Sequence, residues 1–480
     1  MPACHLRDRS ADRREAVVTV PAVRTSFTAL TALTALTALA VLATPVLAGS
    51  PRGISGPSPY GTCSQGYQQG AEGSPAIARA EDPVVVWQQD IKHGAGPDVV
   101  TSGAGLLSTA GPLAGGACSP QGRPGEVGTA PSLATAPDGT VWSATVVNGP
   151  SGGRVWVAHL APGGTWQSEV VAELSTGLPN LEYMPATVAV APATPTTPLT
   201  VHVAYIRNNF PAGTLAVHRS HVVGSGVWSS EHPLNFGPTP VGYDFAEQLV
   251  SLGGQELLAV STEIEQAGFV PLLPDYLTYG DLTQAPIEHR VRRSSDGGVT
   301  WSLPTVALRL ANGGVRDCEV PGTALRSLVR PSVAVRSDGR VHIAGESVAA
   351  NGRETSILVA SSCGVAGWCT ETAAVVPGTA FSASIAADQR GRLAVSWLDL
   401  SDDAAGDSVL SARWRWSSTG PKGWSKSRAI TDAFDLRALV PAYVGDQGAL
   451  LGQRDGFVAA PVVGTGDPAN PSDVLLIDLG

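Results

Sequence analysis

Short runs of alternating apolar and polar residues recur along the chain, separated by turns rich in glycine, proline and aspartate. The two clearest cover residues 131–139 and 331–339, and each pattern predicts a strand that ends in an Asp-Gly turn. A second alternating run follows each turn, at 141–144 and at 341–344. The pattern therefore predicts β-hairpins, and beyond the amino-terminal segment it contains no amphipathic helical stretch of useful length.

A tryptophan follows a short glycine-containing turn at five places: Trp166, Trp228, Trp301, Trp368 and Trp424. Combined with the hairpins, this gives a repeating unit of strand, tight turn, strand, loop, strand, Trp-marked turn and strand. Looser copies of its opening begin near residues 75, 185, 247, 382 and 446. Four short antiparallel strands per unit are typical of a propeller blade. We therefore predict an all-β fold, a β-propeller of four-stranded antiparallel blades, with seven counted and six if one opening is misread.

The two ends of the chain predict a signal peptide and a strand that closes the propeller ring. Residues 27–43 form an apolar run followed by Val46-Leu47-Ala48, so residues 1–48 are expected to be a signal peptide with a long amino-terminal region. The last unit has room for about three strands before Gly480. A strand upstream of Pro75 would complete it and remove an exposed sheet edge. This assigns residues 49–73 to a linker or ring-closing strand and 74–480 to the propeller.

Charge and cysteine content bear on the binding partners and on the cellular location that we expect. The net charge of −10 argues against nucleic acid and anionic membranes. No second run is long and apolar enough to span a bilayer, so we expect a secreted, soluble, monomeric protein. An exported chain favours disulfides, and the candidates are Cys63, Cys118, Cys363 and Cys369, whose connectivity sequence alone does not fix. No cysteine or histidine spacing suggests a zinc site.

Residues 294–301, SSDGGVTW, carry a denser motif. The Asp296 carboxylate can accept hydrogen bonds from the amides of its own turn, Gly298 permits a positive φ, and the Trp301 indole can cover the hairpin. With Ser294 and Thr300, these residues fit the Asp-box pattern. The motif, the blade period and the opening at 82–90 resemble secreted bacterial proteins of the sialidase (BNR/Asp-box) superfamily over residues 74–480.

The resemblance implies a six- or seven-bladed propeller. For active members it also implies retaining hydrolysis of sialosides by a tyrosine nucleophile with a glutamate, an aspartic acid/base and three arginines that hold the sugar carboxylate. By position, the catalytic candidates here are Tyr443, Asp90, Asp98 and Glu263, and the substrate-binding candidates are Arg316, Arg330, Arg437 and Tyr279. Asp-box residues are expected on the opposite face, with a structural role.

One departure from the family pattern bears on activity. The first blade opens with Gly73-Ser74-Pro75, where active sialidases place the first carboxylate-binding arginine. Neither glycine nor serine can supply that charge. We therefore expect a secreted propeller that binds a glycan or an extracellular protein without hydrolysis. The alternatives are an active exo-sialidase or related exo-glycoside hydrolase, and a purely structural or protein-interaction propeller. No cofactor is required, although an acidic loop could hold calcium through Asp399, Asp402, Asp403 and Asp407.

Overall fold

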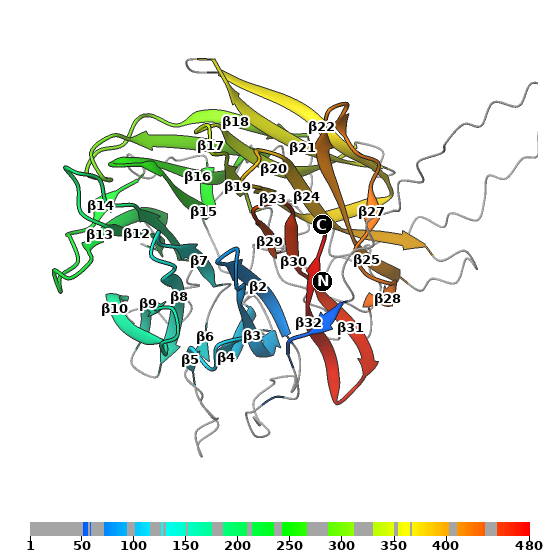
Figure 1. The fold of residues 1–480 in the computed structure, drawn as a ribbon, viewed down its shortest axis with the longest axis horizontal. Helices are drawn as coiled ribbons and strands as arrows, with labels where there is room; N and C mark the ends of the chain where they lie inside the picture. The colour runs from blue at the N-terminus through cyan, green and yellow to red at the C-terminus, as the bar shows by residue number, and fades with distance from the viewer. Residues whose placement is uncertain are drawn as a thin grey trace, which may run out of the picture. The chain divides into compact units, whose positions relative to one another are not determined.

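The computed structural model describes residues 51–55, 58, 72–93, 101–115, 126–127, 131–149, 152–174, 186–208, 214–234, 242–265, 287–311, 330–349, 354–364, 367–402, 410–436 and 449–480. The chain divides into two units, Met1–Leu47 and Ala48–Gly480, and the predicted leader lies outside the described residues. Within those residues the second unit is all β, and its sheets form seven four-stranded antiparallel blades arranged in a ring (Figure 1). The prediction of a seven-bladed propeller is confirmed.

Blades 2 to 4 follow the predicted unit, and blade 1 has two short outer strands in place of one. Blade 1 contains β2 (Glu72–Ala78), β3 (Val84–His93), β4 (Thr101–Ser108), β5 (Ala114–Gly115) and β6 (Glu126–Val127). Blade 2 contains β7 (Ser132–Thr135), β8 (Val141–Gly149), β9 (Gly152–Leu160) and β10 (Gln167–Leu174). Blade 3 contains β11 (Thr187–Ala191), β12 (Thr200–Asn208), β13 (Thr214–Val222) and β14 (His232–Pro233). Blade 4 contains β15 (Gly242–Gly253), β16 (Glu256–Glu265), β17 (Ile287–Ser294) and β18 (Thr305–Leu310).

The last three blades complete the ring. Blade 5 contains β19 (Ser332–Val335), β20 (Val341–Val348), β21 (Glu354–Cys363) and β22 (Gly367–Pro377). Blade 6 contains β23 (Thr379–Ala387), β24 (Leu393–Asp402), β25 (Leu410–Gly420), β26 (Gly423–Trp424), β27 (Arg428–Ala429) and β28 (Phe434–Asp435). Blade 7 contains β29 (Ala449–Gly452), β30 (Phe457–Ala460), β31 (Val462–Asp467), β32 (Asn470–Asp478) and, from the other end of the chain, β1 (Arg52–Gly53).

The innermost strands identify the ring. β2, β7, β11, β15, β19, β23 and β29 contact one another in that order, and β29 contacts β2 again. The outer strand of blade 7 is β1, where Arg52 pairs with Leu476 of β32 and the Ile54 amide donates to the Val474 carbonyl at 3.0 Å. The ring is therefore closed by residues upstream of the first blade, as the incomplete last unit predicted. Closure removes the exposed sheet edges of an open fold.

The hydrophobic core lies between blades. One cluster joins Trp142 of blade 2 to Tyr205 of blade 3, and another joins Val359 of blade 5 to Trp397 of blade 6. Between blades 6 and 7, the Trp414 indole Nε1 donates to the Val462 carbonyl at 2.8 Å. Alternating residues on each strand supply these contacts because successive side chains point to opposite faces of a sheet. Each blade is thus stabilised by its neighbours.

The five Trp-marked turns lie at equivalent places, between the third and fourth strands of blades 2 to 6. Around one of them, Cys363 of β21 and Cys369 of β22 form a disulfide. Cys63 and Cys118 lie outside the described residues. Within the described residues, no helix is long and apolar enough to span a bilayer.

Candidate functional site

The two faces of the ring differ in what they present. We call the loop face the side formed by the segments that enter each blade and by the loops between its second and third strands. The hairpin face is the opposite side, which carries the Trp-marked turns. On the loop-face end of the second strand, blades 1, 4, 5 and 6 place Asp90, Glu263, Glu346 and Asp399. Carboxylates therefore gather on the face where propellers place their binding sites.

Blade 6 carries a partly buried ion pair at the loop face. Arg415 of β25 donates through Nε to Asp399 Oδ2 at 2.6 Å. Asp399 is also the register partner of Arg413 on the same two strands. Burial raises the pKa of Asp399, whereas the charge and hydrogen bond of Arg415 oppose that rise. A charge-assisted contact of this kind holds both groups in a fixed geometry.

Two buried polar atoms of this cluster lack a partner. Asp399 Oδ1 and Arg413 Nε are shielded from solvent and make no hydrogen bond within the described part of the chain. Buried polar atoms are nearly always satisfied, because leaving one unpaired costs about 1–3 kcal/mol. An acceptor and a donor on neighbouring strands match a hydroxyl group, which can both donate and accept. The two atoms therefore offer an acceptor and a donor to a buried water or to a ligand hydroxyl.

Blade 4 repeats the arrangement. Arg290 of β17 contacts Glu263 of β16 at 2.5 Å through Nη1, and it donates to Glu288 Oε2 through Nε and Nη2 at 2.8 and 2.7 Å. Arg309 approaches Glu288 Oε1 at 3.1 Å. In both blades the arginine lies opposite the residue two before the carboxylate: Arg290 opposite Ser261, and Arg415 opposite Trp397. Equivalent ion pairs thus lie at one register of two blades.

Between blades 5 and 6, Glu346 is committed to backbone donors. Its carboxyl oxygen accepts from the Ala383 amide at 3.4 Å. Burial raises the pKa of Glu346 to about 7, although hydrogen bonds from backbone amides, including that of Ser382, partly offset the rise. Ser382 has a φ of 57° within a bulge of β23, and Ser74 has a φ of 47° in the equivalent bulge of β2. β2 and β23 therefore each contain a strained bulge at the loop face, with serine at a positive φ.

Blade 1 supplies a pair of carboxyl groups. Asp90 is buried, has a φ of 53°, and accepts hydrogen bonds from Ser58 Oγ at 2.5 Å and from Gln89 Nε2 at 3.2 Å. Glu72 accepts from the Val474 amide at 2.9 Å. Burial raises the pKa of Glu72 to about 8, with smaller contributions from its neighbours that include the charge of Asp90. Both groups bind segments of the ring closure, so neither is presented to a ligand by the described residues.

Several predicted site residues lie outside the described residues, namely Tyr443, Asp98, Arg316, Arg437, Tyr279, Asp403 and Asp407. Arg330 is described: it is buried immediately before the inner strand of blade 5. Of the proposed calcium ligands, Asp399 pairs with Arg415. The described residues contain no group of three or more His, Cys, Asp or Glu side chains that could hold a metal ion.

Sequence reasoning did not single out Arg290, Arg413, Arg415, Glu346 or Glu72. One signal in the sequence points to the arginines. The third strands of blades 4 and 6 carry arginines at alternate positions, in HRVRR and ARWRW, within otherwise apolar or aromatic runs. Alternate positions share one face of a strand, so two arginines in such a run indicate a polar patch at the strand surface.

The Asp-box turn of blade 4 lies on the hairpin face, and its polar groups hydrogen-bond to one another. Asp296 Oδ1 accepts from Ser294 Oγ at 2.8 Å and from the Thr300 amide at 2.9 Å, and Oδ2 accepts from Thr300 Oγ1 at 2.5 Å. The Trp301 indole donates to the Gly298 carbonyl at 3.0 Å. Slight burial raises the pKa of Asp296, but the hydrogen bonds from Thr300 and Ser294 outweigh it and lower the pKa to about 2.

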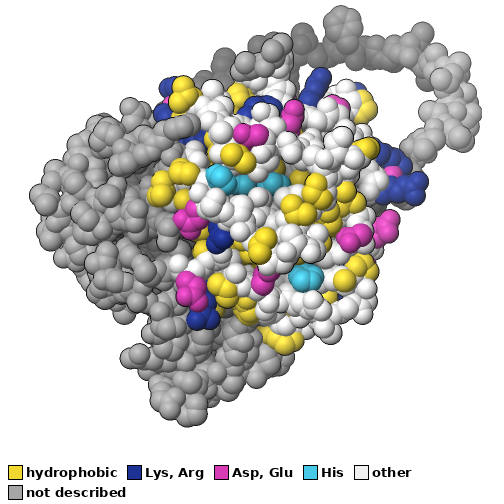
Figure 2. All heavy atoms as spheres, turned by 90° about the vertical axis from the view of Figure 1, so that its left-hand side faces the viewer, with side chains coloured by type: hydrophobic (Ala, Val, Ile, Leu, Met, Phe, Trp, Pro, Cys, Tyr) yellow, Lys and Arg dark blue, Asp and Glu magenta, His cyan; other side chains and the backbone are white. Residues whose placement is uncertain are grey.

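One side of the molecule, seen in Figure 2, shows acidic and basic side chains interspersed over its described part. No extended area of one sign is visible there. Nucleic-acid binding requires a basic tract that follows the phosphate backbone. The described part of this side therefore offers no such surface.

Comparison with known proteins gives a fold likeness. No family model matches the chain, and no curated protein matches it. Among solved structures, an α-L-arabinanase of Penicillium chrysogenum is 12% identical over 73% of this chain and 92% of its own, with a TM-score of 0.43. The sialidase of Trypanosoma rangeli is 12% identical over 75% and 57%, with a TM-score of 0.39. The polysaccharide lyase Uly1 is 11% identical over 87% and 91%, with a TM-score of 0.42.

Proposed function

We propose that this protein is a secreted, glycan-binding propeller of the sialidase-superfamily type, and that its loop face binds sugar hydroxyls without cleaving a glycosidic bond. The observation that carries the proposal is the unsatisfied pair in blade 6, Asp399 Oδ1 and Arg413 Nε. A sugar hydroxyl can donate to the carboxylate and accept from the guanidinium at once. The matching ion pair of blade 4 provides a second polar contact on the same face.

Binding without hydrolysis is favoured by the state of the carboxyl groups. A general acid must be free to transfer a proton to the leaving oxygen, and a nucleophile must approach the anomeric carbon. Asp399 and Glu263 are each paired with an arginine, whereas Glu346, Glu72 and Asp90 are buried and hydrogen-bonded to the protein. An arginine partner opposes the rise that burial gives to the pKa of Asp399. Each arginine also holds its carboxylate in a fixed geometry.

Export is part of the proposal. The apolar leader at 27–43 supports it, and so does the disulfide between Cys363 and Cys369, because disulfides persist outside the reducing cytosol. Expression of the full chain in a bacterium, followed by mass spectrometry of the protein from the medium, tests this part. A mature amino terminus near Gly49 is expected. Retention of the uncleaved chain in the cytoplasm would overturn it.

Catalysis is tested with purified mature protein, a fluorogenic sialoside and a panel of other aryl glycosides, with Tyr443→Phe as the matched variant. The proposal predicts no turnover above the buffer rate for either protein. A glycan array run in parallel should show binding that is lost in Asp399→Asn. Turnover that Tyr443→Phe abolishes would instead establish the exo-glycosidase alternative, and silence in both assays would favour a structural or protein-interaction propeller.

A further inference from the structure

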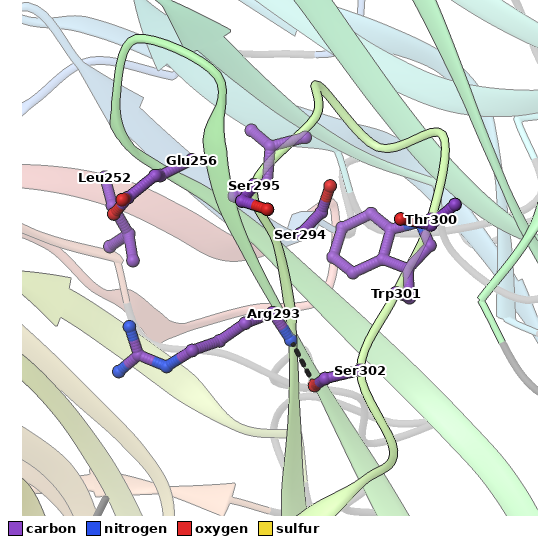
Figure 3. A pocket seen from close by; sticks show the side chains of 9 residues that line it. Leu252, Glu256, Arg293, Ser294, Ser295, Thr300, Trp301 and Ser302 are labelled. Carbon is purple, nitrogen blue, oxygen red and sulfur yellow. Dashed lines mark hydrogen bonds between the residues drawn. The ribbon is translucent and has the colours of Figure 1, made fainter. Parts of the chain in front are cut away.

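A pocket lies on the hairpin face of blade 4, away from the loop-face cluster. Its volume is about 440 Å³, within the range of small-ligand sites. The β15–β16 hairpin contributes Leu252, Glu256 and Leu257 to its lining, and β17 with the Asp-box turn contributes Arg293, Ser294, Ser295, Thr300, Trp301 and Ser302. In Figure 3, Leu252, Glu256 and the guanidinium of Arg293 lie on one side, with Thr300 and Trp301 on the other.

The walls of this pocket are held rigidly. Besides the bonds to Asp296, the Gly298 amide donates to Ser294 Oγ at 2.8 Å, and the Gly297 amide donates to the Gln255 carbonyl at 3.0 Å. The second bond ties the Asp-box turn to the β15–β16 hairpin. Trp301 is buried against blade 3, where its ring contacts His218 edge-on at 5.7 Å. A preorganised wall loses little entropy when a ligand binds.

Three polar groups of the lining are available to a ligand. The Arg293 guanidinium, the Glu256 carboxylate and the Ser295 hydroxyl make no side-chain hydrogen bond or ion pair with the described residues. Arg293 and Glu256 both line the pocket without forming an ion pair with each other. One positive and one negative charge leave the pair neutral, which disfavours a strongly charged ligand.

Apolar groups lie beside these polar ones. Leu252, Leu257 and Trp301 also line the pocket. A pyranose has this dual character, since its ring edge carries hydroxyls and its faces carry C–H groups. Guanidinium and carboxylate groups can hold adjacent hydroxyls by donating to one and accepting from the next.

We propose that this pocket is a second carbohydrate site, one that binds the vicinal hydroxyls of an uncharged pyranose between Arg293 and Glu256. The site goes beyond the loop-face function and is separate from it, so either can fail alone. With both sites occupied, one propeller would hold two sugar chains or two places on one polysaccharide. The Asp-box turn acts here as the rigid support of the pocket.

The test is a titration of deuterated, ¹⁵N-labelled mature protein followed by transverse-relaxation-optimised NMR. The probes are methyl β-D-galactopyranoside, methyl β-D-glucopyranoside and methyl α-D-mannopyranoside, with L-serine as a zwitterionic probe. At least one glycoside should shift the amides of Ser295 and Thr300 with a Kd of about 1 mM, typical of a few hydrogen bonds. Arg293→Gln and Glu256→Gln should each weaken that binding about ten-fold or more. Arg428→Gln, at an exposed arginine of blade 6, is the matched control and should leave it unchanged.

The outcomes separate the two sites. Shifts confined to the amides around Asp399 and Arg413 would overturn the pocket while supporting the loop-face proposal. Shifts at Ser295 and Thr300 that persist in Asp399→Asn would support the pocket whatever the loop face does. Absence of glycoside-induced shifts at these amides, stronger binding of L-serine than of any glycoside, or equal affinity in wild type and Arg293→Gln would each overturn the pocket proposal.

Discussion

The contact between blades 3 and 4 depends on the absence of a side chain at Gly298. A Cβ added there would lie 2.1 Å from His218 Cε1 and 2.4 Å from its Nδ1. The imidazole cannot easily withdraw, because it is buried, its Nε2 lies 3.0 Å from His202 Nδ1, and its ring rests against Trp301. Gly298 also has a φ of 87°, which L side chains rarely adopt. Gly298→Ala should therefore be strongly destabilising.

The expected magnitude has two parts. A non-glycine residue at positive φ costs about 1–2 kcal/mol, and overpacking a rigid contact adds about 1–3 kcal/mol. Together they predict a loss of about 2–5 kcal/mol from the free energy of unfolding. Gly297→Ala is the matched control, since its φ is 72° but its added Cβ would meet nothing within 4 Å. That variant should show the backbone cost alone.

Urea denaturation followed by tryptophan fluorescence and circular dichroism measures the difference between the two variants. The clash itself is isolated by a double-mutant cycle with His218→Ala, which removes the imidazole. Gly298→Ala should cost less in the His218→Ala background than in the wild type. Equal midpoints for Gly297→Ala and Gly298→Ala, or strict additivity in the cycle, would refute the packing of the Asp-box turn against blade 3.

Three further perturbations follow from the buried groups. Burial lowers the pKa of His202 to about 4 and of His218 to about 3. Their contribution to stability is therefore present above pH 6.5 and is lost as the pH falls through about 4 and about 3, respectively, by up to about 1.4 kcal/mol per pH unit for each. Urea midpoints against pH should fall less steeply for His202→Gln than for wild type, and an unchanged slope would contradict this. Glu72 has the opposite sign, because its raised pKa gives a contribution that is full below pH 4.5 and is lost as the pH rises through about 8; Glu72→Gln should flatten the decline of melting temperature between pH 5 and 8, and a parallel curve would count against it. The double variant Cys363→Ser/Cys369→Ser opens a loop with a sequence separation of 6 and should lower the free energy of unfolding by about 2 kcal/mol in urea denaturation. The difference between variant and wild type should disappear when both are measured with reductant.

The fold was predictable because the same turn residues recur in successive blades of the propeller. Asp138-Gly139 and Asp338-Gly339 adopt the expected turns, with Gly139 and Gly339 at φ of 82° and 80°. The tryptophans recur because each one packs in the hydrophobic cluster between its own blade and the preceding blade. Even the closing strand β1 could be expected, since the last unit lacked a strand.

The loop-face cluster was not predictable from the sequence. The pairing of Asp399 with Arg415 depends on the register of two strands, and the contact of Glu346 with the Ala383 amide depends on the seating of one blade against the next. No local sequence motif indicates either of these two contacts. Family resemblance directed attention to Asp90, whereas the structure commits that carboxylate to Ser58 and Gln89.

The central claim is that the loop face binds sugar hydroxyls through the polar cluster of blade 6. A glycan array probed with wild type, Asp399→Asn and Arg415→Gln tests it most directly, with circular dichroism to show that each variant is folded. The account predicts a defined set of bound glycans for the wild type and loss of that set in Asp399→Asn. Undiminished binding of the same glycans by a folded Asp399→Asn protein would contradict it.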